Sequence, residues 1–305
     1  MPFHPQAQAV VDADPIRHLD VVKMGAPAVR ALMDARQKVL AGPPPPVGRT
    51  EDRAIAGPGS LLHLRLYWPS QTPSGPLPVY FYMHSGGYMV YSVDVADVPC
   101  RHICNLGQCL VVSVDYRLAP EFPFPAAIDD CWAALRWLAA SAVSLGGDPR
   151  RLAVGGDSCG GTMASVLAQL ARDHGGPEIR QVVMQGPLVE IRPPDPNPEG
   201  RTQLSDWMRQ SFVRDAKDAQ DPRASPLLAP DLSRLPPHLI LIGEMDGLKP
   251  QAEAYAARLR SSGVPVDWRE FPGMIHNFTG MSAALDGAQD GLAAIGGVLR
   301  QAFSR

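Results

Sequence analysis

One serine stands between glycines at the end of an apolar run, in the stretch "RLAVGGDSCGGTM" (residues 151–163). Gly156, Ser158 and Gly160 fit the pattern G-x-S-x-G, with strand-like residues before it and helix-like residues after it. In that context the pattern is typical of a nucleophile elbow, a turn so sharp that side chains at both glycine positions would collide with a neighbouring strand or helix. The serine is then held in strained backbone geometry with its hydroxyl exposed at the carboxyl edge of a sheet. Ser158 is therefore the predicted nucleophile.

A serine hydroxyl is a poor nucleophile unless a base takes its proton. Where such an elbow occurs, the partners follow in the order serine, acid, histidine. Three histidines come after Ser158. His174 lies at the far end of the next predicted helix, and His238 begins a strand at the opposite edge of the sheet. His276 follows the last predicted strand, on the correct edge, and is the predicted base.

The acid is also expected at the end of a strand. Asp246 closes the predicted strand at residues 238–246, and it could cap the following helix through its second oxygen. Glu244 lies two residues earlier and faces the same side, so it remains the alternative acid. Asp231 and Asp267 fit less well, because one lies in a proline-rich segment and the other in the middle of a strand.

Acyl transfer also needs backbone N–H groups that bind the developing oxyanion. One should come from Cys159, the residue after the nucleophile, and the others from a turn after an early strand. The stretch "HSGG" (residues 84–87) offers such a turn, in which Gly86 and Gly87 allow the backbone to approach a ligand closely. His84 is expected to be a structural residue with hydrogen-bond partners.

These residues require a sheet that brings strand ends together. Strand-like runs occur at residues 61–68, 77–84, 109–117, 151–158, 181–188, 238–246 and 265–273. Helical spacing occurs at residues 15–42, 126–140, 161–176, 251–263 and 288–303. Because strands alternate with helices, we expect an α/β fold with a mainly parallel sheet and helices on both faces.

Two segments fall outside this alternation. Residues 1–48 contain helices and then a linker with four successive prolines, and residues 49–305 are the predicted catalytic domain. Within that domain residues 190–237 are polar, rich in proline and partly helical. A segment of that length between two core strands is typical of a lid over a site.

Composition narrows the function classes. The formal net charge is −3, which does not favour a nucleic-acid partner, and no apolar run is long enough to span a bilayer. The first residues lack the pattern of a signal peptide. Five cysteines without paired spacing indicate reduced thiols in a cytoplasmic protein rather than a metal site or disulfides.

Several longer motifs together resemble the hormone-sensitive-lipase-like group of α/β-hydrolases, the bacterial carboxylesterase/lipase family. The resemblance runs from about residue 77 to residue 278. The motifs are "HSGG" (84–87), "DYRLAPEFPFPAAIDD" (115–130), "GDSCGG" (156–161), "GEMDGLKPQAEAYAARLRSSGV" (243–264) and "HNF" (276–278). The resemblance implies an α/β-hydrolase fold with a helical cap built from the N-terminal helices and the inserted segment.

The same resemblance implies residue roles. It matches Ser158, Asp246 and His276 to the catalytic triad, and Gly86, Gly87 and Cys159 to the oxyanion hole. Ser85 departs from the family, which has glycine at the first position after the histidine. If that position requires a positive φ, Ser85 strains the turn. A second departure, Gly-Leu-Lys-Pro at residues 247–250, replaces the usual Pro-Leu-Arg-Asp.

We therefore expect a serine carboxylesterase that hydrolyses small, short-acyl esters through an acyl-enzyme, without metal or cofactor. A biosynthetic acyltransferase, lactonase or amidase with the same triad is the alternative, and a non-catalytic small-molecule receptor is a remote one. Candidate substrate-binding residues are Tyr88, Met89, Trp207, Met208 and Phe212; plain packing between cap and core explains them equally well. The last strand and helix (265–303) could offer an edge for a homodimer.

Overall fold

The structure, a computed structural model, describes residues 2–71, 73–191 and 202–304. The strands are β1 (Arg49–Ala56), β2 (Leu61–Trp68), β3 (Leu77–Met83), β4 (Leu110–Asp115), β5 (Gly147–Asp157), β6 (Gln181–Gln185), β7 (His238–Gly243) and β8 (Val266–Phe271). The helices are α1 (Pro5–Asp12), α2 (Val21–Met24), α3 (Ala26–Ala41), α4 (Asp97–Gly107), α5 (Ala126–Ser141), α6 (Cys159–His174), α7 (Gln203–Phe212), α8 (Ala216–Gln220), α9 (Lys249–Ser261) and α10 (Asp286–Phe303). Short 3-10 turns lie at Pro15–His18, Ala142–Leu145, Pro226–Leu228 and Phe278–Gly280.

The strands form one sheet in the order β1-β2-β4-β3-β5-β6-β7-β8. β1 and β2 are antiparallel to each other, and β2 is antiparallel to β4. From β4 through to β8 every neighbouring pair is parallel. This is the mainly parallel sheet that the alternation of strands and helices predicted, in the α/β-hydrolase fold that the resemblance implied. The carboxyl ends of β3, β5, β7 and β8 therefore meet at one edge.

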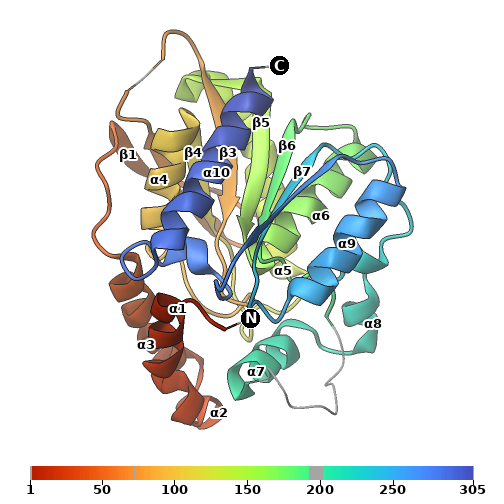
Figure 1. The fold of residues 1–305 in the computed structure, drawn as a ribbon. Helices are drawn as coiled ribbons and strands as arrows, with labels where there is room; N and C mark the ends of the chain where they lie inside the picture. The colour runs from red at the N-terminus through yellow and green to blue at the C-terminus, as the bar shows by residue number, and fades with distance from the viewer. Residues whose placement is uncertain (1, 72, 192–201, 305) are drawn as a thin grey trace.

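Helices cover both faces of the sheet (Figure 1). The central strand β3 shows the division, because Phe81 belongs to the apolar cluster that contains α5 and α6, while Tyr80 and Tyr82 belong to the cluster that contains α4 and α10. All seven residues of β3 are buried, as expected for a strand covered on both faces. The sheet is thus a rigid support for the loops at its carboxyl edge.

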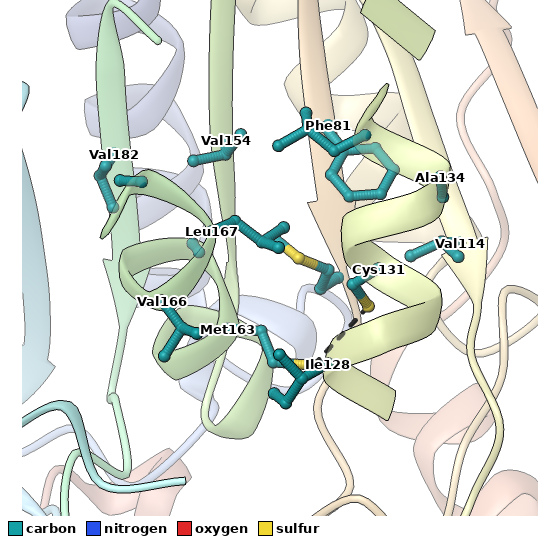
Figure 2. Close-up of a cluster of buried hydrophobic side chains, with 14 of the residues drawn as sticks. Phe81, Val114, Ile128, Cys131, Ala134, Val154, Met163, Val166, Leu167 and Val182 are labelled. Atoms are coloured by element: carbon teal, nitrogen blue, oxygen red, sulfur yellow. Dashed lines mark hydrogen bonds between the residues drawn. The ribbon is translucent and has the colours of Figure 1, made fainter. Parts of the chain in front are cut away.

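Helix α6, which begins directly after Ser158, is locked in place by apolar packing. Figure 2 shows Met163 of α6 pointing toward α5, where Cys131 donates a weak hydrogen bond from Sγ to Met163 Sδ at 3.7 Å. The other labelled side chains are Phe81, Val114, Ile128, Ala134, Val154, Val166, Leu167 and Val182. Since interiors of this kind are close-packed, α6 has one position relative to the sheet.

A second group of helices lies over the carboxyl edge, where Figure 1 shows α1–α3 beside α7. We call α1–α3 together with α7 and α8 the cap. Its two parts touch, because Gln203 accepts a hydrogen bond from the Val21 N–H at 3.2 Å and donates one to Asp20 at 3.2 Å. Residues 192–201 of the predicted inserted segment 190–237 lie outside the described part of the chain.

The structure also contains elements that the sequence patterns did not indicate. β1 is an edge strand with only Ile55 buried, so its sequence "RTEDRAIA" lacks the apolar alternation of a half-buried strand. α4 was not predicted, and its sequence "DVPCRHICNLG" places a proline in the first turn. The single helical run expected at residues 15–42 is divided by Gly25, which has a φ of 79° between α2 and α3.

Candidate active site

The elbow at Ser158 has the geometry that its glycines suggested. β5 ends at Asp157, α6 begins at Cys159, and Ser158 between them has φ 55° and ψ −120°. A Cβ atom at either Gly156 or Gly160 would overlap the carbonyl oxygen of Met83 on the adjacent strand β3. Only glycine fits at these two positions, and the positive end of the α6 dipole lies directly behind the hydroxyl.

Asp246, which follows β7, and His276, which follows β8, reach Ser158 at the end of β5 across the intervening strand β6. The Nε2 atom of His276 lies 3.0 Å from Ser158 Oγ, and its Nδ1 atom lies 2.8 Å from Asp246 Oδ2. Asp246 is buried, whereas the imidazole side chain is 37% exposed, so the ring faces both the carboxylate and open space. The other oxygen, Asp246 Oδ1, accepts the Leu248 N–H at 2.8 Å, which fixes the carboxylate ahead of α9. The structure thus brings the three predicted residues together.

The charge of Asp246 acts on the histidine. Burial lowers the pKa of His276, but the negative charge of Asp246 and its hydrogen bond together outweigh burial, so the pKa lies above the ordinary value of 6.5. The carboxylate therefore favours the imidazolium form that results when His276 takes a proton.

The remaining acidic and histidine candidates have hydrogen-bond or packing partners away from the Ser158, His276 and Asp246 cluster. Glu244, the alternative acid, accepts the Gly273 N–H at 2.8 Å and has no hydrogen bond to His276. His238 is buried and bonds Ser165 at 3.2 Å, and burial lowers its pKa to about 4. His174 packs beside Trp132 at the far end of α6. His84 is also buried, stacks on Tyr116 at 4.1 Å between ring centroids and has a pKa lowered to about 4 by burial.

The turn after β3 offers backbone donors. Gly86 and Gly87 have φ values of 111° and 57°, and a Cβ at Gly86 would overlap the Val90 carbonyl. Among the backbone–backbone hydrogen bonds of the described loops and turns, none uses the N–H groups of Gly86, Gly87 or Cys159, and the Gly87 backbone interacts with the neighbouring Cys159 thiol. We call residues 84–91 the oxyanion segment.

The expected strain at Ser85 is absent. Ser85 is not among the described residues with a positive φ, so the position accommodates a side chain without a left-handed backbone. Ser85 is 6% exposed and its hydroxyl interacts with the buried Asp157, which also accepts a hydrogen bond from Tyr82 at 2.6 Å. The departure at residues 247–250 places Lys249 in an ion pair with Glu270 at 2.7 Å.

The candidate substrate residues divide into two groups. Tyr88 and Phe212 are buried and stack on each other with ring centroids 3.6 Å apart, and Met89 is fully buried against the cap. These three act as packing between cap and core. Trp207 and Met208 of α7 are only partly buried, and Met208 Sδ would lie 2.6 Å from a Cβ at Gly87. Met208 is therefore a partly buried candidate of the cap that lies directly against Gly87.

Gly186, which follows β6, was missed by sequence reasoning. It has φ 51°, and a Cβ there would lie 2.8 Å from Asp246 Oδ2 and 3.1 Å from His276 Nδ1. Any larger residue would push the carboxylate and the imidazole apart. The available signal was a glycine at the end of a parallel strand that lies between the strands carrying the serine and the acid.

Within the described residues, no group of three or more His, Cys, Asp or Glu side chains is arranged to hold a metal ion. No helix in that part of the chain combines the length and apolar character needed to cross a membrane.

Comparison with known proteins finds an α/β-hydrolase family model and curated ester hydrolases that are similar to this chain. A family model described as alpha/beta hydrolase fold matches residues 80–280. The chain is 38% identical to Carboxylesterase NlhH of Mycobacterium tuberculosis over 86% of this chain and 87% of that one. It is 38% identical to an ethyl acetate hydrolase of Pseudomonas putida over 80% of this chain and 79% of that one.

Solved structures agree in fold over nearly the whole chain. An ester hydrolase from the metagenome of Lake Arreo superposes with a TM-score of 0.90 at 31% identity, covering 99% of this chain and 100% of that one. The thermophilic carboxylesterase EstE1, from a metagenomic library, superposes with a TM-score of 0.86 at 33% identity, covering 93% and 99%.

Proposed function

Because the chain belongs to the hormone-sensitive-lipase-like family of α/β-hydrolases and is a carboxylic ester hydrolase, we propose that it cleaves small, short-acyl esters with Ser158 as its nucleophile. The observation that most supports this role is the 3.0 Å separation of Ser158 Oγ from His276 Nε2, with Asp246 at 2.8 Å behind the ring. The proton acceptor, the nucleophile and the group that orients the acceptor are in hydrogen-bond contact.

The proposed reaction has two halves. Ser158 Oγ attacks the ester carbonyl while its proton passes to His276 Nε2, and Asp246 stabilises the resulting imidazolium. The N–H groups of Gly86, Gly87 and Cys159 bind the oxyanion. The C–O bond to the alcohol then breaks as His276 returns the proton to the leaving oxygen. Water repeats the sequence on the acyl-enzyme, releasing the acid and restoring the Ser158 hydroxyl.

The experiment is a panel of p-nitrophenyl esters of increasing acyl length, assayed with the wild-type protein and with Ser158→Ala. We expect the highest kcat/KM on short acyl chains, and a loss of at least about 1,000-fold in kcat for Ser158→Ala. The variant should keep the wild-type melting temperature, since only one oxygen is removed. Undiminished turnover by a folded Ser158→Ala protein would refute the role of Ser158.

Two departures from the family motivate the alternative of an acyltransferase, lactonase or amidase: Ser85 and the block at residues 247–250. The first is weakened, because Ser85 lacks a positive φ. Adding an alcohol acceptor to the same panel separates transfer from hydrolysis, because an acyltransferase forms the new ester faster than the free acid. A non-catalytic receptor would leave every ester intact.

We also propose that residues 1–48 and the segment 190–237 form one covering unit over a catalytic domain at residues 49–305. The bonds from Gln203 to Asp20 and Val21 support it, because they join the two parts directly. Among the substrate candidates we propose Met208 and Trp207 as pocket residues, since both are partly exposed. Tyr88, Met89 and Phe212 support the pocket from behind.

We further propose an oligomeric state and a location for the protein. A homodimer through β8 is supported by the position of β8 at the end of the sheet, with β7 as its one paired neighbour among the described strands. A cytoplasmic location is supported by five buried, unpaired cysteines, which suit a reducing compartment. Sedimentation of the purified protein tests the dimer.

A further inference from the structure

Helix α3 of the cap carries Arg30, whose guanidinium contacts the oxyanion segment. The Nε–H of Arg30 donates to the Met89 carbonyl at 2.8 Å, and Nη2 donates to the Ala119 carbonyl at 2.9 Å. Ala119 in turn donates its N–H to the Tyr88 carbonyl at 2.8 Å. One cap side chain therefore holds two successive carbonyls of the oxyanion segment, one directly and one through Ala119.

Those carbonyls lie where the backbone is strained. Tyr88 has φ 62° and Tyr91 has φ 74°, both in the left-handed region that non-glycine residues rarely adopt. Such conformations persist only where the surrounding structure holds them. The Met89 carbonyl lies between these two strained residues. The bond from Arg30 therefore restrains the backbone between them.

A short chain of bonds connects this point to an oxyanion donor. The N–H groups of Met89 and Val90 both donate to the Gly86 carbonyl at 3.0 Å. The Gly86 carbonyl and the Gly87 N–H belong to one planar peptide unit and point in opposite directions. Fixing that carbonyl therefore fixes the direction of the Gly87 N–H, and a shift of Met89 would turn the donor.

Glu121 holds the guanidinium in the required orientation. Nη1 and Nη2 of Arg30 donate to the two carboxylate oxygens of Glu121 at 2.8 and 2.5 Å. The bidentate pair leaves Nε and the remaining Nη2 hydrogen directed at the two carbonyls. A lysine has no planar fork and cannot make these contacts together.

We propose that Arg30 is a positioning residue for ester hydrolysis, which couples the docked cap to the orientation of the Gly87 N–H. This inference rests on the proposed function, in which that N–H binds the oxyanion. Arg30 touches neither the ester nor Ser158, so its effect should fall on the transition state and leave substrate binding largely unchanged.

The test compares Arg30→Ala with Arg36→Ala, a matched control on the same helix. Arg36 also forms an ion pair, with Asp14 at 3.4 Å, and its charge acts on Tyr91, but among the described residues it has no hydrogen bond to a carbonyl of the oxyanion segment. With each protein normalised by active-site titration, we expect Arg30→Ala to lower kcat roughly 10- to 100-fold with KM within about threefold, and Arg36→Ala to retain kcat. Guanidinium at a non-denaturing concentration should restore part of the kcat of Arg30→Ala.

A second readout addresses the oxyanion directly. A trifluoromethyl ketone forms a tetrahedral adduct with the serine, so its affinity should fall in Arg30→Ala by about the same factor as kcat/KM. Unchanged kcat and unchanged ketone affinity would overturn the inference. An equal loss in Arg36→Ala would also overturn it, because a loosened cap would then explain both. Arg30→Lys, which keeps the charge, should show a smaller loss of kcat than Arg30→Ala, with KM unchanged. It replaces Arg30→Ala as the test variant if that protein does not fold.

Failure of the proposed function has a different signature. In that case the wild-type protein itself would not bind the trifluoromethyl ketone, and Ser158→Ala would retain turnover. A wild-type protein that binds the ketone tightly, beside an Arg30→Ala protein that binds it equally well, contradicts only the role of Arg30.

Discussion

At the scale of single residues, the site depends on the environment of one imidazole. The Asp246 carboxylate raises the pKa of His276 against the opposing effect of burial. A base must be neutral to accept the proton of Ser158. The raised pKa therefore moves the loss of activity at acid pH to a value above 6.5, and activity increases as the pH rises through the pKa.

The pH profile of kcat/KM tests this relation. We expect a half-maximal point above pH 6.5 in the wild-type protein, and a shift to lower pH in Asp246→Asn together with a fall of about 10,000-fold in kcat. Glu244→Gln is the control, because it preserves a side chain near the Gly273 N–H without touching His276. A profile that moves with Glu244→Gln and stays fixed in Asp246→Asn would reverse the assignment of the acid.

Sequence reasoning singled out three residues with chemical groups that the structure brings together, and it missed residues that only make room or direct a neighbour. Ser158, Asp246 and His276 stand out because few residues of their type follow a strand in the required order. Gly186 has no reactive group, and its importance appears only once Asp246 and His276 lie against its Cα. In the sequence nothing distinguishes Arg30 from the other arginines. Its contact with the Met89 carbonyl appears only in the structure, where α3 lies beside Met89.

At the scale of elements, α7 sets the space above the oxyanion segment. Met208 of α7 lies so close to Gly87 that even a methyl group at position 87 would meet its sulfur at 2.6 Å. The side chain is flexible and apolar, and it borders the position where an ester would bind between Ser158 and the N–H donors. We therefore expect its volume to limit the length of the acyl or alcohol group.

Shortening this side chain should widen the substrate range. We expect Met208→Ala to raise the ratio of kcat/KM for an octanoate ester over an acetate ester by about tenfold, since each accommodated methylene contributes roughly 1 kcal/mol or more. Met24→Ala on α2 removes the same atoms from an exposed part of the cap and should leave the ratio unchanged. An unchanged ratio in Met208→Ala would place the acyl chain elsewhere.

β1 shows why an element can lack a sequence signal. It pairs with β2 along its whole length, yet its side chains are mostly exposed, so no burial imposed an apolar pattern on it. α4 is different, because it buries Cys100, Ile103 and Cys104 on one face and its periodic pattern was overlooked. Local periodicity identifies elements that bury one regular face, and it loses those that do not.

At the scale of the whole molecule, the sheet brings together residues that are distant in sequence. Ser158 and His276 are separated by 118 positions, yet β5, β6, β7 and β8 are consecutive neighbours in the sheet. Parallel strands end at one edge, so the order of the strands alone brings the three loops together. This part of the architecture was predictable, whereas the contacts between cap and core depend on docking geometry that no local pattern records.

The proposed mechanism requires that Ser158 becomes covalently acylated. Acid-quenched reaction with a p-nitrophenyl ester, or labelling with a fluorophosphonate, followed by peptide mass spectrometry, detects the adduct. We expect one adduct per chain on Ser158, with labelling strongly slowed in His276→Asn. An adduct on a different residue, or ester turnover with no adduct at Ser158 under either reagent, would contradict it.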